Sequence, residues 1–321
     1  MSGKTFKQTF PVRSYECDFY GHVNNANYLR YMQQAAADAS AAAGWDEARY
    51  HSIGHLWLIR ETDIEYLIPL RYGDTVEITT WAAEFRRVRS TRYYELRNGS
   101  GEVVSRAKTD WVYVHRATGR PAAVPPEMIA DFAPPDLFPT DLASPNDITR
   151  TLPAAFERKK FPAPPPPPPG VFTQRRLVEW RDVDQERHVN NATYLNYLEE
   201  AGFGATRFFG WPIARMMAEK LGIVARRLQI QYRLPATFGE EIAISTFLSE
   251  TRRSTTVRHY SITRADDGVL LAQARGLFVF VNPETGRITR LPPQIMTDFA
   301  SHIAGSIANV AELVRPPHTS P

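Results

Sequence analysis

The chain has 321 residues, of which 43% are hydrophobic and 23% charged, a composition typical of a globular protein with a substantial core. The length favours two domains of ordinary size over one very large domain. The formal net charge is only +3, so the overall balance gives no reason to expect a nucleic acid or an anionic membrane as partner.

Cysteine content and hydropathy exclude further classes. The single cysteine, Cys17, cannot form a disulfide within the chain, and no Cys/His spacing resembles a zinc site, so we expect neither a metal ion nor another cofactor. The opening segment MSGKTFKQTF lacks the apolar stretch of a signal peptide, and no apolar run reaches about 18 residues. We therefore expect a cytoplasmic protein without membrane insertion.

In chain order, the first predicted elements are a short strand at residues 6–15, a polar loop, and a helix. The apolar and small helix positions Tyr28, Met32, Ala35 and Ala39 recur at steps of four, three and four, which marks one buried face. Asn24 is the expected N-cap, with Val23 and Tyr28 at the positions of a hydrophobic staple. Four alternating segments separated by Gly-Asp and Asn-Gly turn signals then predict strands at residues 57–70, 75–85, 90–98 and 103–115.

A proline-rich stretch follows at residues 144–170 and contains FPAPPPPPPG. Six consecutive prolines favour polyproline II and form a semi-rigid spacer of roughly 19 Å at ~3.1 Å per residue. A spacer between domains is the simpler interpretation, and a ligand for an SH3-like partner is the alternative.

The second half of the chain repeats the first. An offset of 166 residues pairs Asp18 with Asp184 and His22 with His188. After one inserted residue the offset is 167, and PPEMIADFA (125–133) pairs with PPQIMTDFA (292–300). We therefore predict two α+β domains, each with one long helix packed on an antiparallel sheet. Their bounds are 1–143 and 171–300, with the spacer at 144–170 and a tail at 301–321.

The pattern Asp-x-x-Gly-His-Val-Asn-Asn-x-x-Tyr from Asp18, followed by Ile-Glu-Tyr, resembles hotdog-fold thioesterases of the 4-hydroxybenzoyl-CoA thioesterase type. Residues 180–201 are more similar to acyl-acyl-carrier-protein (acyl-ACP) thioesterases, which carry Asp-x-x-x-His-Val-Asn-Asn in a tandem hotdog. The resemblance implies a sheet wrapped around a central helix, two such units paired within the chain, and acyl-thioester sites at their seam.

The activity that this resemblance implies is hydrolysis of acyl-CoA or acyl-ACP thioesters, with water as co-substrate and no cofactor. One alternative is a module that binds acyl thioesters without turnover, and another is a hotdog enzyme of a different type, such as an enoyl-thioester hydratase. Association of several double-hotdog chains into a homo-oligomer is also left open.

Three residues of the first copy are the main catalytic candidates. Asp18 is predicted to act as an acid–base group or nucleophile, or else only to cap the loop. His22 is expected to orient water or bind the carbonyl, or else to be a structural histidine under the loop. Glu65 aligns with a carboxylate that some family members use as base, or else faces solvent on its strand; its counterpart Gln231 has no carboxylate and cannot be a general base.

The second copy keeps Asp184 and His188 but differs around them. Glu186 stands where the plant-type enzymes carry a catalytic asparagine, and Arg187 replaces the glycine. Either Glu186 acts as the base or this copy has drifted from hydrolysis, so we expect the Asp18 site to be the more intact one.

Substrate binding is assigned to the helix N-termini and to two arginine pairs. Unpaired N–H groups at a helix N-terminus polarise a carbonyl, and one such donor typically contributes about 2.7–4 kcal/mol in the transition state. Gly21 would let the thioester approach the backbone closely. The arginines would bind CoA phosphates or the acidic helix of a carrier protein, or else simply solvate the sheet. The candidate binding residues are Gly21, Val23, Asn24, Asn25, Asn190, Asn191, Arg86, Arg87, Arg252 and Arg253.

Overall fold

The computed structural model describes residues 4–132 and 161–305. The chain divides into two compact units, Met1–Phe161 and Pro162–Pro321. Most of the predicted spacer lies outside the described residues, and its six prolines, which are described, belong to no helix or strand. The exact domain bounds therefore stay a prediction.

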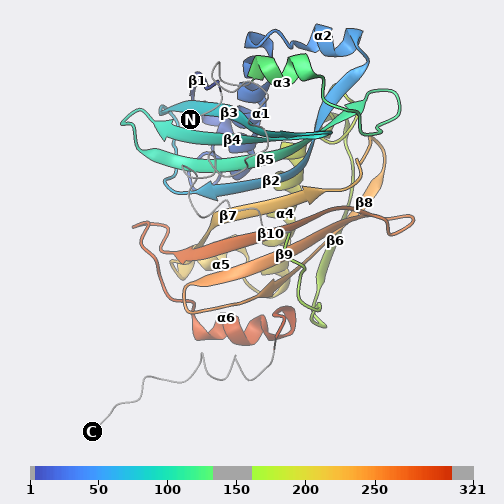
Figure 1. Ribbon diagram of the computed structural model, residues 1–321. Coiled ribbons are helices and arrows are strands. Elements are labelled where there is room, and N and C mark those ends of the chain that lie inside the picture. The colour runs from blue at the N-terminus through green and yellow to red at the C-terminus, as the bar shows by residue number, and fades with distance from the viewer. Residues whose placement is uncertain (1–3, 133–160, 306–321) are drawn as a thin grey trace. The chain divides into compact units, whose positions relative to one another are not determined.

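The first unit is an antiparallel sheet with one long helix (Figure 1). Its strands follow the order β1-β3-β4-β5-β2, and every neighbouring pair is antiparallel. The elements are β1 (Phe6–Pro11), η1 (Ser14–Glu16), α1 (Asn25–Ala42), α2 (Glu47–Ser52), β2 (His55–Tyr66), β3 (Thr75–Arg86), β4 (Arg89–Asn98), β5 (Val103–His115) and α3 (Pro126–Phe132).

The second unit repeats this plan, with strand order β6-β8-β9-β10-β7. Its elements are β6 (Phe172–Leu177), η5 (Trp180–Asp182), α4 (Asn191–Phe208), α5 (Ile213–Ala218), β7 (Gly222–Tyr232), β8 (Glu241–Ser249), β9 (Thr255–Arg264), β10 (Leu270–Val281), α6 (Pro293–Asp298) and η6 (Ala300–His302). The predicted α+β class and the duplication are confirmed. The second copy has one residue more than the first, and this residue lies in the turn from β9 to β10. There Arg264 N–H bonds to Val269 O, whereas in the equivalent turn of the first unit Asn98 N–H bonds to Glu102 O.

Both long helices begin where the capping signal predicts. The Asn24 side chain accepts a hydrogen bond from Ala26 N (3.0 Å), and the Asn190 side chain accepts one from Ala192 N (2.9 Å). The predicted buried positions of α1, Tyr28 among them, are buried. The small residues on this face let α1 lie against β1 and β3, and α4 lies against β6 and β8 in the same way.

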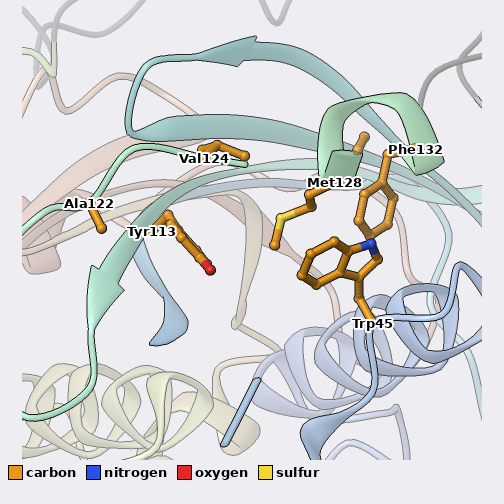
Figure 2. Packing of buried hydrophobic residues seen from close by; sticks show 7 residues of the cluster. Trp45, Tyr113, Ala122, Val124, Met128 and Phe132 are labelled. Atoms are coloured by element: carbon orange, nitrogen blue, oxygen red, sulfur yellow. The ribbon is translucent and has the colours of Figure 1, made fainter. Parts of the chain in front are cut away.

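A second part of each core lies beyond the C-terminal end of the long helix. In the first unit, Trp45 packs with Met128 and Phe132 of α3 (Figure 2), and its Nε1 donates to Asp131 Oδ2 at 2.9 Å. In the second unit Trp211 donates to Asp298 Oδ2 at 2.8 Å. The sequence pattern did not predict α2, α3, α5 or α6.

The residues after α6 are part of the second unit as far as they are described. His302 is completely buried, Ile303 pairs with Leu248, and Gly170 N–H bonds to Ser301 O (2.8 Å). Residues 301–303 thus contact the rest of this unit, and the predicted start of the tail stays a prediction. Among the helices that the structure describes, none is long and apolar enough to span a membrane; the cytoplasmic location stays a prediction.

Candidate active site

The Asp-x-x-Gly-His segment of the first unit is a closed loop in front of α1. Cys17 pairs with Val23 in an isolated β-bridge, and Asp18 N–H bonds to His22 O at 2.7 Å. The turn is completed by Gly21 N–H to Asp18 O (2.9 Å), with Gly21 at φ 74°, a conformation that glycine adopts without strain. The sequence folds this way because the glycine permits the turn and Asn24 starts the helix directly after it.

Asp18 is half-buried and caps this loop. Its Oδ1 accepts hydrogen bonds from Tyr20 N (2.8 Å) and His22 N (3.2 Å). Asp18 therefore caps the loop, and its catalytic role stays a prediction. Both bonds end on the same oxygen, so they orient the carboxylate without using Oδ2, and capping leaves room for the proposed chemical role.

His22 is half-buried, and its Nε2 is buried without a hydrogen-bond partner in the described part of the chain. Burial is the main cause that lowers the pKa of His22; the nearby charge of Arg71 lowers it further, and Asp18 raises it. Burial therefore favours the neutral imidazole, and Nε2 has no hydrogen-bond partner in the described residues.

Arg71 is the residue that the sequence interpretation missed. It lies in the loop from β2 to β3 and forms an isolated antiparallel pair with His22. A Cβ atom added to Gly21 would lie 3.8 Å from Arg71 Nη1, so the guanidinium lies beside Gly21. The one signal in the sequence was the repeat itself, because Arg71 has Thr237 as counterpart while Gly21 has Arg187.

The helix N-terminus offers fewer free donors than predicted. The N–H groups of Val23, Asn24 and Ala26 donate to Leu70 O (2.8 Å), Glu16 O (2.9 Å) and Asn24 Oδ1 (3.0 Å). Of residues 23–26, Asn25 alone has an N–H without an acceptor among the described residues, and Asn191 is its equivalent in the second unit. The predicted set of backbone donors is therefore corrected to one per loop.

Glu65 is not brought together with Asp18 and His22 in its own unit. The adjacent Tyr66 donates its hydroxyl to Asn25 O (3.2 Å) and so faces α1. Because successive side chains of a strand point to opposite faces, Glu65 faces away from α1. It lies opposite Arg106 in the register of β2 and β5. This placement corrects the prediction that Glu65 is a base of this loop.

The two arginine pairs are also placed away from the loops of their own units. Arg86 and Arg87 are exposed at the far end of β3. That strand starts next to the loop and spans about 36 Å over twelve residues at ~3.3 Å each. Arg252 and Arg253 occupy the equivalent turn after β8. The role of these arginines in binding CoA phosphates or a carrier protein stays a prediction, and it would act at a distance from the loops.

The second loop has the same backbone with different side chains. Asp184 N–H bonds to His188 O and Arg187 N–H bonds to Asp184 O, both at 2.9 Å. Arg187 adopts φ 62°, so a non-glycine residue is held in the turn. The Asp184 carboxylate accepts from Glu186 N (3.0 Å) and from Asn190 Nδ2 (3.5 Å). Although Asp184 is exposed, desolvation of its carboxyl group is the main cause that raises its pKa, and the Glu186 charge adds to it.

Two family models match the chain in sequence. Residues 3–132 match the acyl-ACP thioesterase N-terminal domain, and residues 178–299 match the thioesterase-like superfamily. A named relative, acyl-[acyl-carrier-protein] hydrolase FATB2 of Cuphea viscosissima, is 23% identical over 62% of this chain and 47% of its own length. Oleoyl-acyl carrier protein thioesterase 2 of Arabidopsis thaliana is 27% identical over 62% and 54%. The chain thus spans about half the length of these relatives.

Solved structures share the fold. The 12:0-ACP thioesterase of Umbellularia californica is 19% identical with a TM-score of 0.63, covering 85% of this chain and 93% of that one. An acyl-ACP thioesterase of Bacteroides thetaiotaomicron is 17% identical with a TM-score of 0.62, covering 86% and 98%. The motif, the repeated fold and the two models agree: the chain carries an acyl-ACP thioesterase N-terminal domain followed by a thioesterase-like superfamily domain, and it has the tandem hotdog fold.

Proposed function

We propose that the protein hydrolyses acyl-ACP thioesters to a free fatty acid and the carrier thiol. One observation carries this proposal: the first loop holds the Asp18 carboxylate, the neutral His22 imidazole and the unpaired Asn25 N–H together at the start of α1. A base and an oxyanion donor are what addition of water to a thioester requires. The names of the relatives support this reaction class.

In the proposed mechanism His22 is the general base. It removes a proton from water as the water oxygen bonds to the carbonyl carbon, and the carbonyl oxygen becomes an oxyanion. Asn25 N–H donates to that oxyanion. Asp18, whose charge raises the pKa of His22, stabilises the imidazolium that forms. The intermediate then expels the thiolate, which takes the proton from the imidazolium, so that acid and thiol leave and His22 is neutral again.

A carrier protein is the proposed acyl donor in preference to CoA. Three large aromatic side chains around the first loop are highly exposed: Tyr15 (79%), Phe19 (73%) and Tyr72 (70%). Exposed aromatic groups are typical contacts for a protein partner. The relatives are named for acyl carrier protein substrates, which agrees with this choice.

The test is hydrolysis of a panel of acyl-ACP and acyl-CoA thioesters, read as released thiol. We expect turnover of acyl-ACP, and we expect Asp18→Asn to lower kcat at least tenfold because a neutral amide cannot stabilise the imidazolium. The matched variant Asp184→Asn should lower it less. If the wild type binds acyl-ACP but releases no thiol, the chain is a binding module and the proposal is wrong.

A further inference from the structure

The two repeats carry an arginine near the loop histidine at different sequence positions. The first unit has Gly21 in the loop and Arg71 across from the histidine, whereas the second unit has Arg187 in the loop and Thr237 across from it. Each loop therefore has one arginine next to its histidine, contributed by different segments. An arginine that is absent from one position of a repeat and present at a position next to it in the fold suggests that the positive charge near the histidine has a function.

The backbone geometry supports this equivalence. His22 pairs with Arg71 and His188 pairs with Thr237 in the same kind of isolated antiparallel bridge. The turn residues have closely similar conformations, with φ 74° at Gly21 and φ 62° at Arg187. Each unit thus has its own copy of the same bridge. Arg71 lies opposite the histidine in the first unit, and Arg187 lies directly before the histidine in the second.

Neither arginine has a structural partner that would explain it. No described residue accepts a hydrogen bond from the side chain of Arg71 or of Arg187, and both residues are exposed. By contrast, the guanidinium of Arg13 binds Glu16 Oε1 at 3.1 Å. An exposed arginine often only solvates a surface, but Arg71 lies beside Gly21 and its charge acts on His22.

We infer that this guanidinium is the second oxyanion donor, supplied by Arg71 in the first unit and by Arg187 in the second. The inference rests on the proposed function. Asn25 offers a single N–H, whereas the tetrahedral intermediate of acyl transfer is commonly held by more than one donor. The planar guanidinium has several N–H donors and stays charged at any working pH. The flexible side chain donates to the oxygen as negative charge develops on it.

The test moves the arginine from one position to the other. In the full chain with Asp184→Asn and His188→Gln, which remove the carboxylate and the histidine of the second loop, we compare Arg71→Thr, Gly21→Arg and the double variant. The double variant gives the first loop the arginine arrangement of the second. Arg71→Thr should lower kcat about 100-fold with little change in KM, because the interaction forms in the transition state. The double variant should recover at least tenfold of that loss. The mirror experiment is Arg187→Gly in a chain with Asp18→Asn and His22→Gln.

The inference is wrong if Arg71→Thr keeps kcat within threefold, or if the folded double variant is no faster than Arg71→Thr. A readout that does not depend on turnover is the His22 titration followed by NMR. The positive charge of Arg71 lowers the pKa of His22, so Arg71→Thr should raise this pKa. Gly21→Arg in the double variant should reverse the rise. Asp18 is the other charge that acts on the His22 ring. An unchanged titration in Arg71→Thr overturns the placement of the guanidinium, whereas a wild type without turnover overturns the proposed function instead.

Discussion

Tyr28→Phe is the most informative stability variant, because one hydroxyl joins the long helix to the loop that carries Arg71. Leu70 N–H donates to Tyr28 Oη at 3.2 Å, and both residues are almost fully buried. Burial raises the pKa of Tyr28 to about 12, so the hydroxyl is neutral at working pH. Phenylalanine keeps the ring and its volume, and it removes only the acceptor.

The loss of stability in Tyr28→Phe comes from Leu70 N–H, which stays buried without an acceptor. A buried N–H without an acceptor costs about 1–3 kcal/mol, and for a domain of this size that corresponds to a fall in Tm of about 2–12 °C. Chemical denaturation with an unchanged m value would show that the native state is destabilised and not expanded. Turnover should fall as well, since Arg71 follows Leu70 directly.

The second unit offers the matched control. Ala236 N–H donates to Tyr194 Oη at 3.1 Å, so Tyr194→Phe should destabilise by a similar amount and leave the first loop intact. A Tyr28→Phe variant within 0.3 kcal/mol of wild type, a margin well below the cost of about 1 kcal/mol expected for a buried unsatisfied donor, would refute the reasoning.

Two further predictions concern pH and the carrier. Burial lowers the pKa of His259 and of His302 to about 4. As the pH falls, these histidines bind a proton in the unfolded chain near pH 6.5 but in the folded chain only near pH 4. The free energy of unfolding should therefore be highest above pH 6.5 and fall between pH 6.5 and 4, by up to about 3 kcal/mol for each histidine. Urea unfolding at pH 7 and pH 5 measures this, and a His302→Gln variant with an unreduced pH dependence contradicts it. Tyr72→Ser should raise KM for acyl-ACP severalfold and leave acyl-CoA unaffected, with Phe238→Ser as control; an equal effect on both substrates argues against the carrier contact.

Local signals made the fold and the loop predictable. The helix start at Asn24, the buried face around Tyr28 and the turn at Gly21 depend on neighbours within a few residues, and the internal repeat showed each of them twice. The capping role of Asp18 is local for the same reason.

What could not be predicted depends on contacts distant in sequence. Arg71 meets His22 only because the loop after β2 folds back onto the turn. The alternation of β2 shows that Glu65 and Tyr66 face opposite sides, yet it does not say which side holds α1; the bond from Tyr66 to Asn25 does. The free N–H of Asn25 likewise appears only after the partners of its neighbours are known.

The one-residue difference between the β4–β5 and β9–β10 turns has a practical consequence. The flanking strands keep their antiparallel pairing on both sides, although one turn closes from Asn98 to Glu102 and the other from Arg264 to Val269. The chain has thus already accommodated a change of length at this point without loss of the hotdog architecture. This hairpin is the natural place to introduce a short peptide tag or a fluorophore, as a reporter for carrier binding that leaves both loops unmodified.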